Sequence, residues 1–156
     1  MARITQVQKL ENQKNYDEIV LNLFLAEGHE ALTYARIAQE IGISLTTLQG
    51  YYSSTRAIRS VLHKHMLSIV IESLDFSSEA AFVQSWQDAL GDEQFQYVIK
   101  LMFFHASQVK SPEEFDLSSN GEFREKMFES FGTDSVRILE TVVGRSMFHL
   151  TNFKQH

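Results

Sequence analysis

The sequence TYARIAQEIGISLTTLQGYY, from Thr33 to Tyr52, holds the clearest structural pattern of the chain. It predicts two short helices that are joined by a turn at residues 41–44. Gly42 tolerates the positive φ that such a turn requires, and Ser44 can cap the helix that follows. Thr33 is suited to cap the helix that precedes the turn. This order of cap, helix, turn, cap and helix is typical of a helix-turn-helix.

The apolar residues of this segment predict which side of each helix is buried. In the second helix Leu48 and Tyr52 lie four residues apart and therefore share one face. Short hydroxyl and amide side chains occupy the opposite face, which suits the major groove of DNA. The same pattern also fits an ordinary solvent-exposed helical hairpin. The inward-facing set is predicted to be Ile37, Ile41, Ile43, Leu48 and Tyr52.

Capping and breaking residues divide the rest of the chain into further helices. The chain has one proline and seven glycines, and no segment alternates long enough to indicate a strand. We expect an all-α fold, with a three-helix DNA-binding head at 1–56 and a helical bundle at 57–156. The predicted helices span 10–27, 33–41, 44–52, 55–74, 78–90, 92–109, 122–131 and 133–153. A mobile loop is expected at 113–121, which is acidic and contains serine.

Charge is unevenly distributed along the chain, whose formal net charge is −6. Residues 1–65 hold seven Lys and Arg against six acids, and the remainder holds seven against fourteen. The basic character of a nucleic-acid-binding surface is therefore present but weak.

The absence of cysteine excludes disulfides, thiolate metal sites and a cysteine nucleophile. The N-terminus is polar and no apolar run approaches the length of a membrane helix, so we expect a cytoplasmic protein that does not enter membranes.

Residues on both sides of Thr33–Tyr52 extend the pattern. FLAEGH (24–29), IAQEIGIS (37–44), TL (47–48), YY (51–52) and Ser54 followed by AI (57–58) resemble the signature of the TetR family. The resemblance covers about residues 16–62. Members of that family are homodimeric regulators, usually repressors, whose helical C-terminal body dimerises and often binds a small effector. The resemblance implies a transcriptional regulator that binds a palindromic operator in double-stranded DNA and is released by a small apolar effector.

The resemblance assigns DNA contacts to positions of this sequence. Thr33 and Ser54 match helix caps near phosphates, and Ser44 matches the cap of the recognition helix. Thr47 and Tyr51 match positions that usually meet DNA. The DNA-binding set implied by the resemblance is Thr33, Arg36, Ser44, Leu45, Thr46, Thr47, Gln49, Gly50, Tyr51, Ser54 and Thr55.

Four positions depart from the family pattern. Leu45 and Thr55 replace lysines, Thr46 replaces a glycine, and Gln49 replaces a tyrosine that often contacts a phosphate. Two usual phosphate contacts are thereby weakened, so we expect an unusual operator, a lower affinity, or help from an N-terminal arm. The basic residues of that arm are Arg3, Lys9 and Lys14.

The body is rich in aromatic residues, because eleven of the twelve phenylalanines and the single tryptophan follow residue 75. These side chains either form the core of the body, which is the more common arrangement, or line an apolar effector pocket with a histidine as its polar group. The candidate pocket set is Phe82, Trp86, Met102, Phe103, His105 and Phe128.

The last predicted helix carries a continuous apolar seam. Its small residues Gly144 and Ser146 permit close packing against another helix. Pairing of two seams across a two-fold axis would present two recognition helices to a palindromic site, whereas burial within one chain is the alternative. The expected dimer interface is Val136, Leu139, Val143, Gly144, Met147 and Leu150.

Patterns for catalysis and metal binding do not occur in the sequence. His63 and His65 lie two apart on a helix and face different ways. No glycine-rich phosphate loop, nucleophile elbow or HExxH pattern is present. We expect no enzyme activity, no metal and no cofactor. Two alternatives to a DNA-binding regulator stay open: a TetR-fold protein-interaction module with weak or no specific DNA binding, and a binder of small apolar molecules.

Overall fold

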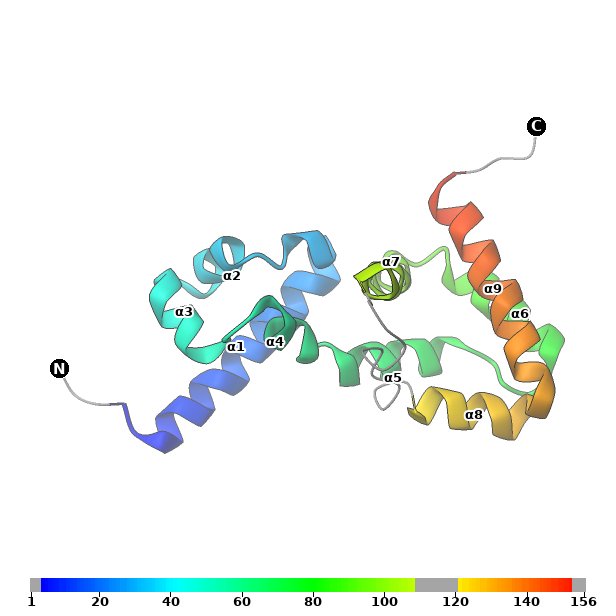
Figure 1. Ribbon diagram of the computed structural model, residues 1–156, viewed down its shortest axis with the longest axis horizontal. Helices are drawn as coiled ribbons and strands as arrows, with labels where there is room; N and C mark the ends of the chain where they lie inside the picture. The colour runs from blue at the N-terminus through cyan, green and yellow to red at the C-terminus, as the bar shows by residue number, and fades with distance from the viewer. Residues whose placement is uncertain (1–3, 109–120, 153–156) are drawn as a thin grey trace. The chain divides into compact units, whose positions relative to one another are not determined.

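The computed structural model describes residues 4–108 and 121–152, in which all regular secondary structure is helical (Figure 1). The predicted all-α fold class is therefore confirmed. The chain divides into two compact units, Met1–His65 and Met66–His156, which we call the head and the body. This division falls later in the chain than the predicted boundary after residue 56.

The head begins with a long helix and continues with three short ones. They are α1 (Gln6–Glu27), α2 (Tyr34–Ile41), α3 (Leu45–Tyr51) and α4 (Thr55–Ser60), with a 3₁₀ turn, η1 (His29–Ala31), between the first two. The first helix starts earlier than the predicted residue 10, because Thr5 caps it by accepting a hydrogen bond from the backbone N–H of Gln8.

The core of the head lies between α1 and the short helices. Of the predicted inward-facing set, Ile37, Leu48 and Tyr52 are buried, and Ile41 and Ile43 are half-buried. The buried apolar residues of the head are Val20, Leu23, Phe24, Leu32, Ile37, Ala38, Leu48, Tyr52, Ile58 and Leu62. This core holds α2 and α3 against one side of α1 (Figure 1).

One long helix over 55–74 was the wrong expectation. The structure has α4 and a separate α5 (His63–Ser73) in its place. The backbone N–H groups of Val61 and Leu62 donate to the carbonyls of Ile58 and Arg59, three residues back rather than four. This tightening of the last turn interrupts the α-helical hydrogen-bond pattern.

The body contains α6 (Glu79–Ala89), α7 (Glu93–Gln108), α8 (Gly121–Phe131) and α9 (Ser135–Leu150), with a 3₁₀ turn, η3 (Gly132–Asp134), before the last helix. Ser78 caps α6 through the backbone N–H of Ala81. Thr133 lies within η3 and does not cap α9 as predicted, since the helix begins two residues later. The predicted loop 113–121 lies outside the described residues except for Gly121.

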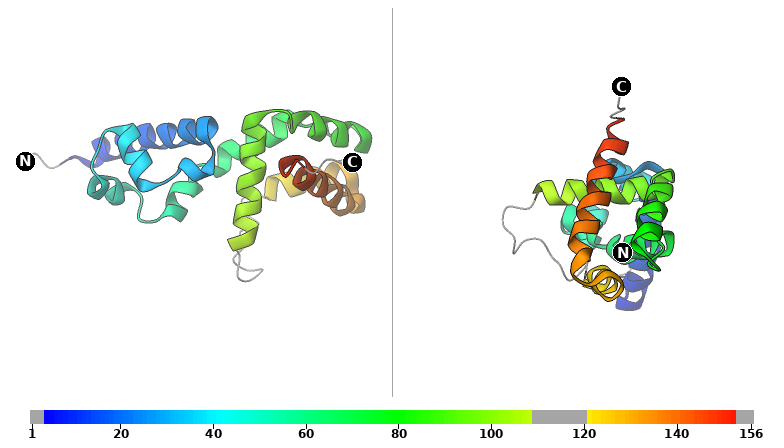
Figure 2. Two further views of the ribbon diagram at one scale, coloured as in Figure 1. Left: turned by 90° about the horizontal axis from the view of Figure 1, so that it is seen from above. Right: turned by 90° about the vertical axis from the view of Figure 1, so that its right-hand side faces the viewer.

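Helix α9 packs along α6 and α8 and forms one wall of the body (Figure 2). Nε1 of Trp86 in α6 donates to Oγ of Ser146 in α9 over 2.8 Å, and this pair is buried. Ser146 is therefore part of the core and not of the small-residue seam predicted for it.

On the surface, Nη1 and Nη2 of Arg137 donate to the two carboxylate oxygens of Glu79 over 2.9 and 2.8 Å. The hydrogen bonds from Arg137 lower the pKa of Glu79.

Candidate nucleic-acid interface

The turn between α2 and α3 is built as the sequence predicts. Gly42 ends α2 in the left-handed region, at φ 80° and ψ 33°, and its N–H donates to the carbonyl of Ala38. Oγ of Ser44 accepts a hydrogen bond from the N–H of Thr47 over 3.1 Å. Oγ1 of Thr33 accepts from the N–H of Arg36 in the same way at the start of α2. Local hydrogen bonds therefore fix the start of each helix and the turn between them.

The outer face of α3 is exposed and carries short polar side chains. Leu45 is 49% exposed, although it is apolar. The hydroxyls of Ser44 and Thr47 form a hydrogen bond of 2.8 Å with each other. The residues of the predicted DNA-binding set that the structure leaves exposed are Thr33, Ser44, Leu45, Thr46, Thr47, Gln49, Gly50, Ser54 and Thr55.

Tyr51 differs from its neighbours in α3 because it is half-buried against α1. Its ring packs edge-on against Tyr16, with 4.8 Å between the ring centroids. Its Oη accepts a hydrogen bond from Nδ2 of Asn12 over 3.1 Å. Nζ of Lys9 lies 5.9 Å from the centroid of the Tyr51 ring. The sequence did not single out Asn12 or Tyr16, because their partner lies more than thirty residues away and local spacing carries no trace of it.

A second tyrosine joins the end of α3 to the rest of the head. The hydroxyl of Tyr52 donates to Oδ1 of Asp17 over 2.6 Å, and Nε2 of Gln13 donates to the same oxygen over 2.8 Å. The hydroxyl of Tyr34 donates to the backbone carbonyl of Tyr52 over 2.7 Å. Burial, and then the hydrogen bond to Asp17, raise the pKa of Tyr52. The position of α3 is thus fixed from both α1 and α2.

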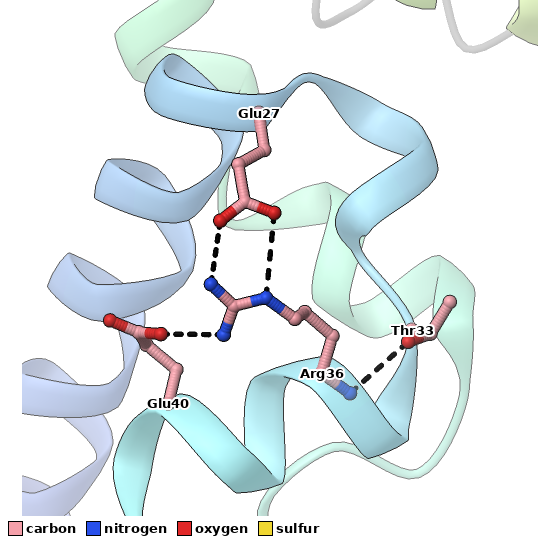
Figure 3. Close-up of polar contacts among 4 residues, drawn as sticks. All are labelled: Glu27, Thr33, Arg36 and Glu40. Carbon is pink, nitrogen blue, oxygen red and sulfur yellow. Dashed lines mark hydrogen bonds and ion pairs between the residues drawn. The ribbon is translucent and has the colours of Figure 1, made fainter.

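Arg36 donates hydrogen bonds to two carboxylates of the head (Figure 3). Its Nε and Nη2 donate to the two carboxylate oxygens of Glu27 at the end of α1, over 3.4 and 2.6 Å. Its Nη1 donates to Glu40 in α2. The hydrogen bonds to Glu27 and then Glu40 raise the pKa of Arg36. In the free head Arg36 therefore links α1 to α2 through two carboxylates, and its place in the DNA-binding set stays a prediction.

The basic residues of the predicted N-terminal arm are only partly described. Lys9 and Lys14 are exposed on α1, whereas Arg3 lies outside the described residues. Arg56 is exposed in the first turn of α4, close in sequence to Ser54.

Within residues 4–108 and 121–152, no group of three or more His, Asp or Glu side chains is arranged to hold a metal ion. The same residues include no helix with the length and apolar character needed to span a membrane.

The predicted effector-pocket residues differ in burial. Phe82 and Trp86 are buried in the core of the body, with ring centroids 5.9 Å apart. Phe128 is 62% exposed on α8. Met102 is exposed, and Phe103 and His105 are half-buried on α7. The first two side chains therefore fit the core interpretation, and an effector pocket stays a prediction.

The predicted dimer-interface residues lie on the face of α9 that points away from its own core. Ile138, Val142 and Ser146 form the buried face of the helix. Val136 is 64% and Met147 50% exposed. The remaining members, Leu139, Val143, Gly144 and Leu150, are half-buried. One chain alone thus leaves two residues of this apolar seam exposed and covers the other four in part.

The geometry defines first a class of protein: an all-helical chain with a small head, whose capped helix pair exposes one face, and a larger helical body. Residues 63–150, more than half of the chain, match the family described as "Tetracycline repressor LuxT C-terminal domain". The protein belongs to this family. The match supports a TetR-type transcriptional regulator, a class of non-enzymatic proteins. No curated protein matches the chain.

Proposed function

We propose that the protein is a repressor that binds a palindromic operator in double-stranded DNA as a homodimer. The observation that carries this proposal is the outer face of α3, where exposed hydroxyl and amide side chains stand on a helix fixed at both ends. The match of residues 63–150 to a TetR-type body supports it independently of the head. The resemblance at residues 16–62 and this match follow one another along the chain.

In this proposal α3 enters the major groove, where some of its side chains contact bases and others contact the sugar-phosphate backbone. Thr46, Thr47 and Gln49 would reach base edges, and the exposed Leu45 would contact a thymine methyl group. A Cβ added at Gly50 would meet nothing within 4 Å, so the surface there is open for close approach of a phosphate. Thr33, Ser44, Ser54 and Thr55 would contact the sugar-phosphate backbone, which fixes the register of the protein on DNA.

The seam on α9 is the proposed dimer interface. A two-fold axis through Val143 and Gly144 would bury the exposed Val136 and Met147 of both copies. Gly144 has nothing within 4 Å of an added Cβ, so a helix of the second copy has room to approach. The pair would then present two α3 helices to half-sites about one DNA turn apart.

Repression would be steric, because a bound dimer competes with the transcription machinery for the same DNA. A small apolar effector would release the protein only by binding a conformation that does not fit the operator more tightly than one that does. The aromatic residues of α6 and α7 are the candidates for contacting it. The cytoplasm is the proposed location.

One observation favours a second candidate, a protein-interaction module with the same fold. Arg36 is balanced by two carboxylates, and Leu45 and Thr55 stand where the family pattern has lysines. Residues 1–65 carry seven Lys and Arg against six acids, and phosphate contacts supply much of the affinity of DNA-binding proteins. A surface of this kind would suit a protein partner if DNA binding proves too weak.

Selection from random double-stranded DNA at two salt concentrations tests the proposal. We expect enrichment of a palindrome whose binding weakens as salt rises. The variants Thr46→Val and Thr47→Val remove hydroxyls without changing shape and should abolish the preference. The matched control is Thr133→Val, which alters an exposed threonine of the body. No enrichment at the lower salt concentration would overturn the proposal and favour the interaction module.

A further inference from the structure

The first turns of α1 carry a chain of polar side chains that runs onto α3. Nε2 of Gln8 donates to Oδ1 of Asn12 over 3.2 Å, and Nδ2 of Asn12 donates to Oη of Tyr51 over 3.1 Å. We call Gln8, Asn12 and Tyr51 the amide ridge. Lys9, beside the ridge, is exposed, and so is Gln8.

Two contacts within the head fix the position of the amide ridge. The Tyr51 ring rests edge-on against Tyr16, with an angle of 76° between the ring planes. Thr5 caps the first turn of α1, so Gln8 stands on a complete helical turn. A side chain whose position is set before binding loses less entropy when it makes a contact.

The Gln8 amide of the ridge has more hydrogen-bonding groups than its described contacts within the head use. A glutamine amide offers two donor hydrogens and an acceptor oxygen, and the contacts described for Gln8 use one of those hydrogens. Such amides pair with the N6 and N7 edge of adenine and also bond to phosphates. Four residues of helix span about 6 Å, which is close to the rise of two base pairs. Glu11 is the one acid among residues 6–12, and it lies about 100° around the helix from Asn12 and about 60° from Gln8.

We propose that the amide ridge is a second DNA-contacting element, which extends the footprint of α3 to the base pairs that flank each half-site. This proposal rests on the proposed function. Gln8 would contact a base edge or the adjoining sugar-phosphate, Asn12 and Tyr51 position it, and the ammonium of Lys9 contacts a phosphate. The ridge thereby supplies contacts that Leu45 and Thr55 do not.

The test uses the full chain and the palindrome obtained by selection, with its flanks randomised. Gln8→Ala should lower affinity about tenfold and flatten the sequence preference of the flanks. Lys9→Gln should leave that preference intact but reduce the slope of log affinity against log salt by about one. Asn22→Ala, which removes an exposed amide farther along the same helix, is the matched control and should bind like the wild type.

Two further results separate failure of this inference from failure of the proposed function. If the wild type binds the palindrome while Gln8→Ala and Lys9→Gln match Asn22→Ala in affinity, flank preference and salt slope, the amide ridge does not contact DNA. If the wild type enriches no DNA at all, both proposals are overturned together. Thermal unfolding of each variant shows whether a lost affinity comes from a disturbed head, and a loss of binding that follows the loss of stability would count against the ridge.

Discussion

The hydroxyl of Tyr52 lies 2.6 Å from Oδ1 of Asp17 and has no other acidic neighbour among its described hydrogen-bond partners. Because its pKa is raised in the folded protein, the folded state keeps this proton at a pH where the unfolded chain loses it. The contribution of this group to the free energy of unfolding should therefore be constant below about pH 10 and fall as pH rises above it.

The variant Tyr52→Phe tests that dependence. We expect a loss of about 1 kcal/mol at neutral pH, from the missing hydrogen bond, and a weaker fall of stability at alkaline pH. Urea unfolding followed by circular dichroism at several pH values measures both. Tyr97→Phe, whose hydroxyl donates to Glu93 at an exposed site, is the control and should keep the wild-type alkaline fall. An equally steep fall in Tyr52→Phe would contradict the prediction.

Trp86 and Ser146 form the corresponding polar pair of the body. Ser146→Ala leaves the buried indole N–H of Trp86 without its acceptor, so we expect a loss of about 1–3 kcal/mol in the free energy of unfolding. The protein has a single tryptophan, so its fluorescence reports unfolding at this site directly. Ser130→Ala, at an exposed position of α8, should be close to neutral. Equal stability of the two variants would show that the hydrogen bond contributes nothing.

At the scale of elements, two glycines of the α2–α3 segment should respond oppositely to alanine. Gly42 has a φ of +80° and Gly50 lies within α3, and a Cβ at either meets nothing within 4 Å. Backbone strain alone then makes Gly42→Ala less stable by about 1–2 kcal/mol. Helix propensity makes Gly50→Ala more stable, by up to about 1 kcal/mol. Melting temperatures of the two variants measure the pair, and a shift in the same direction for both would contradict the argument.

Arg36 offers a test of whether a residue positions α2 or contacts DNA. If its role is to join Glu27 and Glu40, Arg36→Gln lowers operator affinity without changing the slope of log affinity against log salt. A phosphate contact would instead reduce that slope by about one. Arg56→Gln is the comparison, because Arg56 is exposed beside Ser54 and we expect its loss to reduce the slope. A reduced slope in Arg36→Gln would show that Arg36 contacts a phosphate.

Features that depend on residues close together in the sequence were predicted correctly more often than contacts between distant residues. The caps at Thr33 and Ser44 and the turn at Gly42 depend on neighbours three or four residues away, so their signals are local and were read correctly. The break between α4 and α5 was missed, since the apolar pattern runs through it without a glycine or proline.

Contacts between distant segments were beyond prediction from this single sequence. The link from Asn12 to Tyr51 spans 39 residues and that from Trp86 to Ser146 spans 60. Arg36 shows the same limit at shorter range, because its nearness to Glu27 depends on how α2 folds back on α1. Residue type alone could not separate a structural arginine from one that binds DNA.

At the scale of the whole molecule, the seam on α9 should decide the oligomeric state. Met147→Glu places a charge on an exposed apolar position of the proposed interface, where pairing would bury it without a partner. We expect the mass in solution, measured by sedimentation, to fall from that of a dimer to that of a monomer, with operator binding lost. Thr141→Glu, at an exposed position on another face of α9, should stay dimeric. A monomeric wild type would overturn the proposed assembly.

The contacts described for α3 lie within the first sixty residues: Asn12 with Tyr51, Asp17 with Tyr52, and Tyr34 with the carbonyl of Tyr52. These contacts join α3 to α1 and α2 within the head. We therefore expect the head to be transferable between proteins. Fused through α5 to the body of another regulator, residues 1–65 should carry their own operator preference to a new inducer, which makes this short segment a natural starting point for assembling hybrid genetic switches.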